Sequence, residues 1–276
     1  MKKFYILLMI LSLSVSSFSQ KKEKIKGSKV VTIEQKKTGP FENLEISDDL
    51  EIMIIKGENS SIEIEADDNI HQALGFVLNG KILRLSMDKN IGSHKKFNIR
   101  VTYTDTLKTV TTKNEAVINA LQEINLEDIT FKSFDSSKLF LNVKSKKFTL
   151  LANDKSRSEL NVKSDDAVFE LSKDSQTKSI IKSGNLKFDL YQDAKATLEG
   201  DVTEIKLRLD NNSEFRGKKL IAKKMELIAE ISSTCEVNVS ESLSIECSGK
   251  SEIDLYGSQK IDLKKFTDIS RLTKKK

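Results

Sequence analysis

The chain has 276 residues, of which 32% are charged and 38% are hydrophobic, and its formal net charge is +5 at pH 7. This balance is too apolar for an intrinsically disordered chain and too polar for a protein that crosses a membrane many times. With two His, two Cys and no Trp, the sequence has little material for a histidine-based catalytic site or a multi-cysteine zinc site, and an aliphatic core is expected.

The first residues have the pattern of a secretory signal peptide. Lys2 and Lys3 precede an apolar run, Phe4 to Leu13, and Ser17-Phe18-Ser19 forms a small-x-small cleavage site. The run is too short for a membrane anchor, and no Cys follows it to carry a lipid. We therefore expect residues 1–19 to be removed and the protein to be exported to the periplasm, the cell surface or the medium. No later stretch is apolar enough to form a transmembrane segment.

Removal of the signal peptide leaves 44 basic residues against 41 acidic ones, a net charge of +3. The two signs are interspersed, so the charge does not indicate a nucleic-acid partner. Residues 20–40 are basic at their start and end at Gly39-Pro40, which is typical of a flexible linker. A single domain is expected over residues 41–276.

Residues 41–106 are rich in segments that alternate or run apolar, as strands do. The distances from Leu44 to Ile62 and from Ile62 to Ile82 are 18 and 20 residues. These spacings predict irregular first rungs of a repeat. The segments are Phe41 to Ile46, Leu50 to Ile55, Ser61 to Ala66, Ile82 to Met87 and Phe97 to Tyr103.

From residue 107 to 265 the sequence repeats about every 19 residues. Each repeat has an alternating strand, a polar corner and a second short strand, which is typical of a β-solenoid whose turns stack on one another. An antiparallel sandwich is the rival fold, but near-equal intervals without hairpin turns disfavour it. The expected rungs start at Leu107, Leu126, Phe148, Ala167, Leu186, Ile205, Met225, Leu243 and Ile261.

Details of the repeat give further expectations. The rung from Leu126 fits if its corner, at residues 134–138, holds three extra residues. The stretch from Asn114 to Leu126 could form an amphipathic helix, but the repeat favours strands. The ninth position of six rungs is small, as in Ser156, Ser175, Ala194, Ser213, Ser233 and Ser251.

Stacking in register brings equivalent positions of successive rungs together. Opposite charges then become neighbours: Asp189 and Arg208, Lys206 and Glu226, and Glu246 and Lys264. Open ends of a solenoid invite association, so residues 266–276 are a candidate C-terminal cap or tail, and a homo-oligomer would be compatible with this fold.

Candidate reactive residues are few, and most have a structural explanation. Cys235 and Cys247 could form a disulfide in an oxidising compartment or remain buried thiols, and the sequence leaves both open. His71 and His94 are isolated and are expected at the surface. Acidic pairs could bind calcium or act on sugars, but corners of a solenoid are expected to be acidic; these pairs are Asp48-Asp49, Asp67-Asp68 and Asp165-Asp166.

The order of several segments resembles the family known as putative auto-transporter adhesin head GIN domain. The resemblance covers roughly residues 38–270. It implies a right-handed parallel β-helix in an exported bacterial protein with a surface or adhesive role, and it brings no catalytic, cofactor or metal residues. The matching segments are Phe41 to Ile46, Leu50 to Gly57, Ile62 to Ile70, Asn79 to Leu83, Leu107 to Ala116 and Tyr256-Gly257-Ser258.

The sequence therefore predicts an all-β, exported, non-enzymatic binding module that offers a flank of its solenoid to a surface glycan or a protein. Two alternatives remain. Parallel β-helices also carry polysaccharide-acting enzymes, for which Asp189 and Arg208 would be the candidate pair. The rod could also serve as a structural scaffold of the cell envelope.

Overall fold

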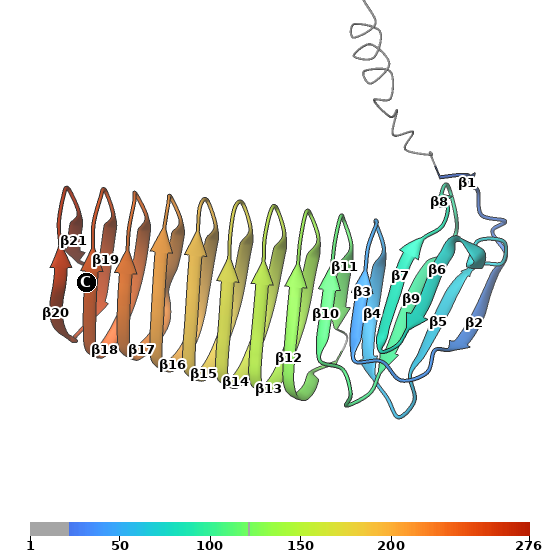
Figure 1. Cartoon of the computed structure of the whole chain (residues 1–276), viewed down its shortest axis with the longest axis horizontal. Coiled ribbons are helices and arrows are strands. Elements are labelled where there is room, and N and C mark those ends of the chain that lie inside the picture. Colours follow the sequence, from blue (N-terminus) through green and yellow to red (C-terminus); the bar gives the residue numbers. More distant parts are fainter. Residues whose placement is uncertain (1–21, 121) are drawn as a thin grey trace, which may run out of the picture.

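The computed structural model describes residues 22–120 and 122–276, and the predicted signal peptide at 1–19 lies outside these residues. The chain forms a parallel β-solenoid of about nine turns with rungs of about 19 residues (Figure 1). The predicted fold class is therefore confirmed. Within the described residues, no helix has the length and apolar character needed to cross a membrane.

The solenoid is flattened into two parallel sheets that enclose one core. Long strands such as β14 and β15 pair residue by residue over both sheets, with Leu160 opposite Ser179 and Phe169 opposite Phe188. The strands of the solenoid are β10 (Thr109–Thr112), β11 (Val117–Ala120), β12 (Ile124–Ser133), β13 (Lys138–Ala152), β14 (Arg157–Leu171), β15 (Gln176–Tyr191), β16 (Lys195–Asp210), β17 (Glu214–Ala229), β18 (Thr234–Cys247), β19 (Glu252–Gly257), β20 (Lys260–Phe266) and β21 (Arg271–Lys274).

Two edges join the sheets, and they differ in construction. We call the first the corner edge; it consists of the short turns between successive long strands, such as residues 153–156. We call the second the bend edge; it consists of the middles of the long strands, such as residues 144–147 and 163–166. At the bend edge the pairing of β13 with β14 passes from Ser145 and Ser164 directly to Lys147 and Asp166, so that Lys146 and Asp165 are left out of the ladder.

The corner edge turns through residues in the left-handed region. Asp135, Asp154 and Lys173 have φ angles of 57°, 59° and 57°. The small residue that ends each corner is completely buried, which confirms the small ninth position of the repeat. In several turns its hydroxyl donates to the carbonyl three residues earlier, as Ser233 does to Glu230 at 2.7 Å. A larger side chain would have no room there.

The core is apolar, as expected, but it is not only aliphatic. Five phenylalanines contact one another in sequence across the turns, with ring centroids 5.0 to 6.1 Å apart. All five are at most 1% exposed. Stacking of successive turns brings these rings together, and they are Phe131, Phe148, Phe169, Phe188 and Phe215.

The predicted start of the rung at Leu126 is wrong. Ile129, not Leu126, lies opposite Phe148. The corner at Asp135 has the same length as the corner at Asp154, since the two stack directly, with Lys155 N donating to Asp135 O at 2.8 Å. The extra residues lie instead between β11 and β12, after Ala120. The stretch around Asn114 to Leu126 forms strands rather than a helix, as the repeat favoured.

The predicted charge neighbours are confirmed in two of three cases. Asp189 lies opposite Arg208 and Lys206 opposite Glu226. Glu246 lies opposite Lys265 rather than Lys264, because the register of β18 and β20 shifts between Ile245 and Glu246.

Residues 41–106 follow the expected irregular rungs only in part. β3 (Asn43–Ile46) and β4 (Glu51–Lys56) form a turn of the solenoid, in parallel pairing with β10 and β11. The segment between them and β10 is an insertion that covers the N-terminal end of the solenoid (Figure 1). It contains β5 (Ser61–Asp67), a 3₁₀ turn (His71–Ala73), β6 (Leu74–Asn79), β7 (Ile82–Met87), β8 (Asn90–Ile91) and β9 (Phe97–Tyr103).

Antiparallel pairing makes this insertion a cap. β5 pairs antiparallel with β9, and β6 with β7, while β7 and β9 pair in parallel with β3 and β4. The hairpin between β6 and β7 turns at Gly80, whose φ is +58°. The cap buries Ile64, Ile99 and Val101 at 0% exposure, so it closes the apolar core at this end.

The two terminal segments also differ from expectation. Within residues 20–40, β1 (Lys24–Ile25) pairs with β8, and β2 (Val31–Lys37) adds an antiparallel strand to β5; a flexible linker was expected. Within residues 266–276, β21 pairs in parallel with β19. This segment therefore continues the solenoid and does not cap it.

Candidate functional site

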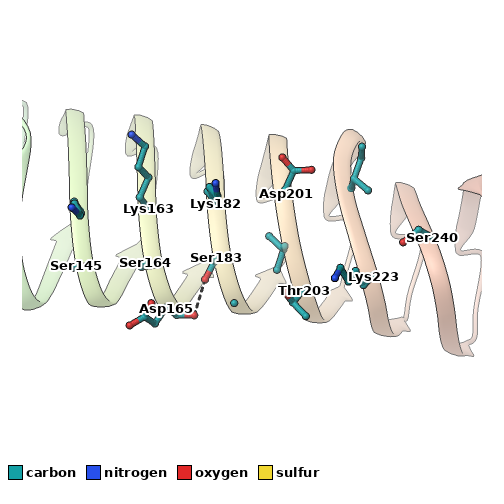
Figure 2. Close-up of a pocket in the computed structure, with 14 residues that line it drawn as sticks. Ser145, Lys163, Ser164, Asp165, Lys182, Ser183, Asp201, Thr203, Lys223 and Ser240 are labelled. Carbon is teal, nitrogen blue, oxygen red and sulfur yellow. Dashed lines mark hydrogen bonds between the residues drawn. The ribbon is translucent and has the colours of Figure 1, made fainter.

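A groove of about 640 Å³ runs along the bend edge across several turns (Figure 2). The groove exists because each long strand changes direction there. We call it the lysine groove, and its lining residues are Lys144, Ser145, Lys163, Ser164, Asp165, Lys182, Ser183, Gly184, Asp201, Val202, Thr203, Ile221, Lys223 and Ser240.

Three lysines form a column in the groove. Lys144 lies opposite Lys163 on the next strand, and Lys163 lies opposite Lys182 on the strand after that. All three side chains are exposed. Neighbouring strands lie about 4.8 Å apart, so three positive charges follow one another along the axis of the solenoid.

The lysine column lacks the charge pairing that is found elsewhere on the surface. Several other basic side chains have an acidic partner one turn away, as Lys219 has in Glu199 at 2.9 Å and Lys224 in Glu204 at 3.2 Å. Among the described residues, Lys144, Lys163 and Lys182 form no salt bridge within the 4.0 Å limit that defines these pairs. Like charges on neighbouring strands are destabilising, so the column adds nothing to the stability of the solenoid.

A serine follows each lysine of the column. The Ser145 and Ser164 hydroxyl oxygens are buried and have no hydrogen-bond partner in the structure. Ser183, in contrast, donates to the carbonyl oxygens of Asp165 at 3.1 Å, drawn in Figure 2, and of Asn185 at 2.8 Å. Two hydroxyls of the groove are therefore not held by an internal hydrogen bond.

The rest of the groove has mixed polarity. Its four lysines outnumber its two aspartates, Asp165 and Asp201. Thr203 and Ser240 add hydroxyls, and Val202 and Ile221 add apolar surface. No aromatic side chain is among the residues that line it. The groove is thus an elongated, positively charged surface with hydrogen-bonding groups.

The predicted cysteine pair lies away from this groove. Cys235 and Cys247 are both buried and both free. Burial raises the pKa of each thiol, so neither is a thiolate at neutral pH. Since the thiolate is the reactive form, these residues act as small apolar side chains of the core.

The structure corrects the prediction for one histidine. His71 was expected at the surface but is only 4% exposed, and its Nε2 lies 2.7 Å from the Thr32 hydroxyl. The reason is the cap, which packs β2 over the 3₁₀ turn that carries His71. His94 is exposed, as expected, with Nδ1 2.8 Å from the Gly92 carbonyl oxygen.

Two of the acidic pairs hold loops together. Asp67 is 0% exposed; burial alone would raise its pKa, but hydrogen bonds from the backbone N–H groups of Lys95, Lys29 and Lys96 lower it overall. Asp48 occupies a left-handed corner with φ 66° and accepts from Met87 N at 2.8 Å. Among the described residues, no group of three or more His, Cys, Asp or Glu is placed to hold a metal ion.

Other predicted acidic residues do not converge on one site. Asp165, from the third pair, lines the lysine groove. Asp189 lies opposite Arg208, yet its carboxylate pairs with Lys187 at 2.9 Å while Arg208 pairs with Glu230 at 3.0 Å. The two side chains therefore turn to different partners.

The lysine groove was not predicted from the sequence, although a signal was present. The dipeptide Lys-Ser recurs at 144–145, 163–164 and 182–183, at the 19-residue spacing of the turns. Once the period is known, this recurrence places three lysines on successive turns. Opposite charges on neighbouring turns support the register of the stack, whereas like charges do not, so this column was not predicted.

Comparisons with known proteins agree with the fold. A family model described as "Putative auto-transporter adhesin, head GIN domain" matches residues 40–258. No curated protein sequence matches the chain.

Solved structures with similar folds come from Parabacteroides. A "putative lipid binding protein" from Parabacteroides distasonis is 14% identical with a TM-score of 0.59, covering 91% of this chain and 97% of that one. A "putative adhesin" from Parabacteroides merdae is 13% identical with a TM-score of 0.58, covering 92% and 100%. A "putative adhesin" from P. distasonis is 13% identical with a TM-score of 0.57, covering 91% and 99%. At these identities the likeness concerns the fold alone.

Proposed function

The chain belongs to the head GIN domain family, and from this premise we propose that it is an exported, non-enzymatic binding module that holds a cell-surface or envelope partner in the lysine groove. The observation that carries the proposal is the column of Lys144, Lys163 and Lys182. Charge that has no partner within the protein, and that costs some stability, is free to be neutralised by a partner outside it.

The rigidity of the groove supports a binding role. Each lysine stands on a strand that is paired on both sides, so the spacing of the charges is set by the backbone ladder. A preorganised surface loses little conformational freedom when a partner binds. The flank of the solenoid can therefore present its charges in a constant pattern.

The contacts in the groove favour binding over catalysis. A serine nucleophile needs a base within hydrogen-bonding distance. In the described structure, the hydrogen bonds of Ser183 lead to backbone carbonyls, and Ser145 and Ser164 have no hydrogen-bond partner. The groove thus supplies charge and hydroxyls without a nucleophile–base pair.

Export is supported by the N-terminal pattern at residues 1–19 and by the adhesin description of the family. It can be tested on intact cells with a membrane-impermeant labelling reagent and an antibody to the protein. Labelling without cell lysis is expected for a surface protein. Recovery only from the cytoplasm would contradict the proposal.

The binding role is tested with residues 20–276 and fractions of purified cell-envelope material. The variant Lys144→Gln/Lys163→Gln/Lys182→Gln should lose retention on the fraction that the unmodified protein binds. The matched control, Lys138→Gln/Lys155→Gln/Lys178→Gln, removes three exposed lysines outside the groove and should bind normally. Equal retention of both variants would show that the groove is not the binding surface.

A further inference from the structure

We propose that the lysine groove binds an acidic polysaccharide that lies along the solenoid axis, with successive anionic groups on successive turns. This inference rests on the binding role proposed above and adds the chemical class and the orientation of the ligand. It follows from the arrangement of the lysine column, from the groups that surround it, and from the side chains that are not in the groove.

The arrangement of the charges requires a linear ligand with several anionic groups. Lys144, Lys163 and Lys182 occupy one ladder position on β13, β14 and β15, so their charges lie in a row about 4.8 Å apart. A single small anion could contact two of them at most. A polymer with an anionic group on each unit can neutralise all three when it runs parallel to the axis.

The ends of the row set the length of the ligand that it can recognise. At the same ladder position Asn125 precedes Lys144, and Asp201 and then Ile221 follow Lys182. The row is therefore bounded by an amide on one side and by a carboxylate on the other. Three consecutive anionic units would fill it, and a fourth would meet Asp201.

The neighbouring polar groups suit sugar hydroxyls. Asp165 and Asp201 can accept hydrogen bonds from them, and Thr203 and Ser240 can both donate and accept. The Ser145 and Ser164 hydroxyls have no internal partner, so a rotation about χ1 can turn them toward a ligand without breaking a hydrogen bond. A sugar chain offers many hydroxyls beside its acidic groups.

The composition of the groove disfavours a nucleic acid. Proteins that bind single-stranded nucleic acids combine positive charge with aromatic side chains on which the bases stack. The lining of the lysine groove contains no aromatic residue and no arginine. Lysine attracts anions as a point charge without the planar, bidentate geometry of arginine, which fits a flexible acidic polymer.

The test uses oligogalacturonates of one to six units, dextran sulfate and neutral dextran, with Kd measured by isothermal titration calorimetry on residues 20–276. Affinity for the oligogalacturonates should rise up to three units and then level off, and neutral dextran should not bind. Raising the salt from about 0.05 M to about 0.5 M should weaken binding strongly, because exposed charges are screened.

Variants locate the binding in the groove. Each of Lys144→Gln, Lys163→Gln and Lys182→Gln should weaken binding roughly threefold to fivefold, as expected for exposed charge pairs, and the triple variant should lose it. Ser164→Ala should weaken binding less. The Lys138→Gln/Lys155→Gln/Lys178→Gln control should bind as the unmodified protein does.

The outcomes separate this inference from the proposed function. Failure of both acidic polymers to bind overturns the ligand class, as does equal binding of neutral dextran. Tighter binding of single-stranded oligonucleotides through the same three lysines does so as well. In these cases the binding role stands if the triple variant still loses retention on envelope material. If the triple variant is retained on envelope material as well as the unmodified protein is, the binding role also fails.

Discussion

The corner edge and the bend edge arise from the same 19-residue repeat, but they turn the chain by different means and differ in how their charges are paired. At the corner edge the backbone turns through left-handed residues, and some buried hydroxyls donate to nearby carbonyls, as Ser251 does to Ser248 at 2.9 Å, whereas the Ser156 and Ser175 hydroxyls have no partner. At the bend edge the chain bends inside a continuous strand, and Ser145 and Ser164 keep hydroxyls without partners.

The charges of the two edges differ more clearly than their hydroxyls do. At the corner edge Asp154 pairs with Lys173 on the next turn at 2.6 Å. At the bend edge each column lysine has another lysine as a neighbour, and Lys182 also lies opposite Asp201 without a salt bridge to it. The corner edge therefore pairs charges of successive turns, whereas the lysine column at the bend edge is not neutralised within the described residues. Substitutions at the two edges should therefore affect different properties.

The largest effect on stability is expected at a glycine of the bend edge that the backbone requires. Gly200 has φ +118°, and a Cβ there would lie 2.1 Å from the Ile181 carbonyl oxygen. Gly200→Ala should lower the free energy of unfolding by about 3 kcal/mol, as strained backbone positions do. Urea denaturation followed by circular dichroism measures this loss.

A nearby glycine provides the comparison for that substitution. At Gly184 a Cβ would lie 3.0 Å from the Asp165 carbonyl oxygen, and φ is not in the left-handed region. Gly184→Ala should therefore be less destabilising than Gly200→Ala. Equal denaturation midpoints for these two variants would contradict the assigned strain.

The next effect is expected at the corner edge. Ser175 is 0% exposed, and Ser175→Leu would add volume where neighbouring turns leave none. Overpacking of this kind costs typically about 1–3 kcal/mol. Asp174→Leu, at an exposed position of the same corner, should have little effect, so similar melting temperatures for the two variants would argue against a closed corner edge.

The corner edge should also respond to acid. The hydrogen bond from Lys173 holds the pKa of Asp154 below its ordinary value of 3.8. A carboxyl whose pKa is lower in the folded state stabilises the fold above the unfolded pKa, and this contribution disappears as the pH falls through the folded value.

Asp154→Asn tests this contribution, because asparagine tolerates the φ of 59° found there. The variant should be less stable than the unmodified protein at pH 7. The difference should shrink as the pH falls below about 4, the range in which the unfolded carboxyl is protonated. Urea denaturation at several pH values measures it, and a difference that does not vary with pH would rule out the ion pair as its source.

The smallest effect should have opposite signs at two lysines. Lys163→Gln removes a charge that faces two like charges, so the protein should become more stable by a few tenths of a kcal/mol. Lys219→Gln removes the partner of Glu199 and should cost about the same amount. Denaturation curves at low salt compare the two, and equal destabilisation would mean that the lysine column is a structural feature.

The repeat could be predicted from the sequence because each turn makes its own local signals. Alternation marks the strands, and the small residue at positions such as Ser156 and Ser175 marks the corners. The frame slipped at Leu126 because the extra residues after Ala120 do not interrupt the apolar alternation. Similarly, the shift at Glu246 depends on a local irregularity of pairing that alternation does not record.

The cap could not be predicted in the same way. β3 pairs with β10, so that Leu44 lies opposite Val110, although 66 residues separate them. The spacing of Leu44 and Ile82 reflects the parallel stacking of β7 on β3, but Ile62 lies on antiparallel β5, and this antiparallel pairing is a long-range property. The burial of His71 follows from this pairing and was missed with it.

The regular recurrence of Lys-Ser has a consequence for how such a protein can change. A tandem duplication of 19 residues within the solenoid would insert a whole turn without disturbing the corners or the cap, because each turn contacts only its neighbours. If the duplicated turn carried Lys163 and Ser164, it would lengthen the row by one charge. Multivalent affinity could then be adjusted in discrete steps, by the number of turns, while the design of each turn stayed the same.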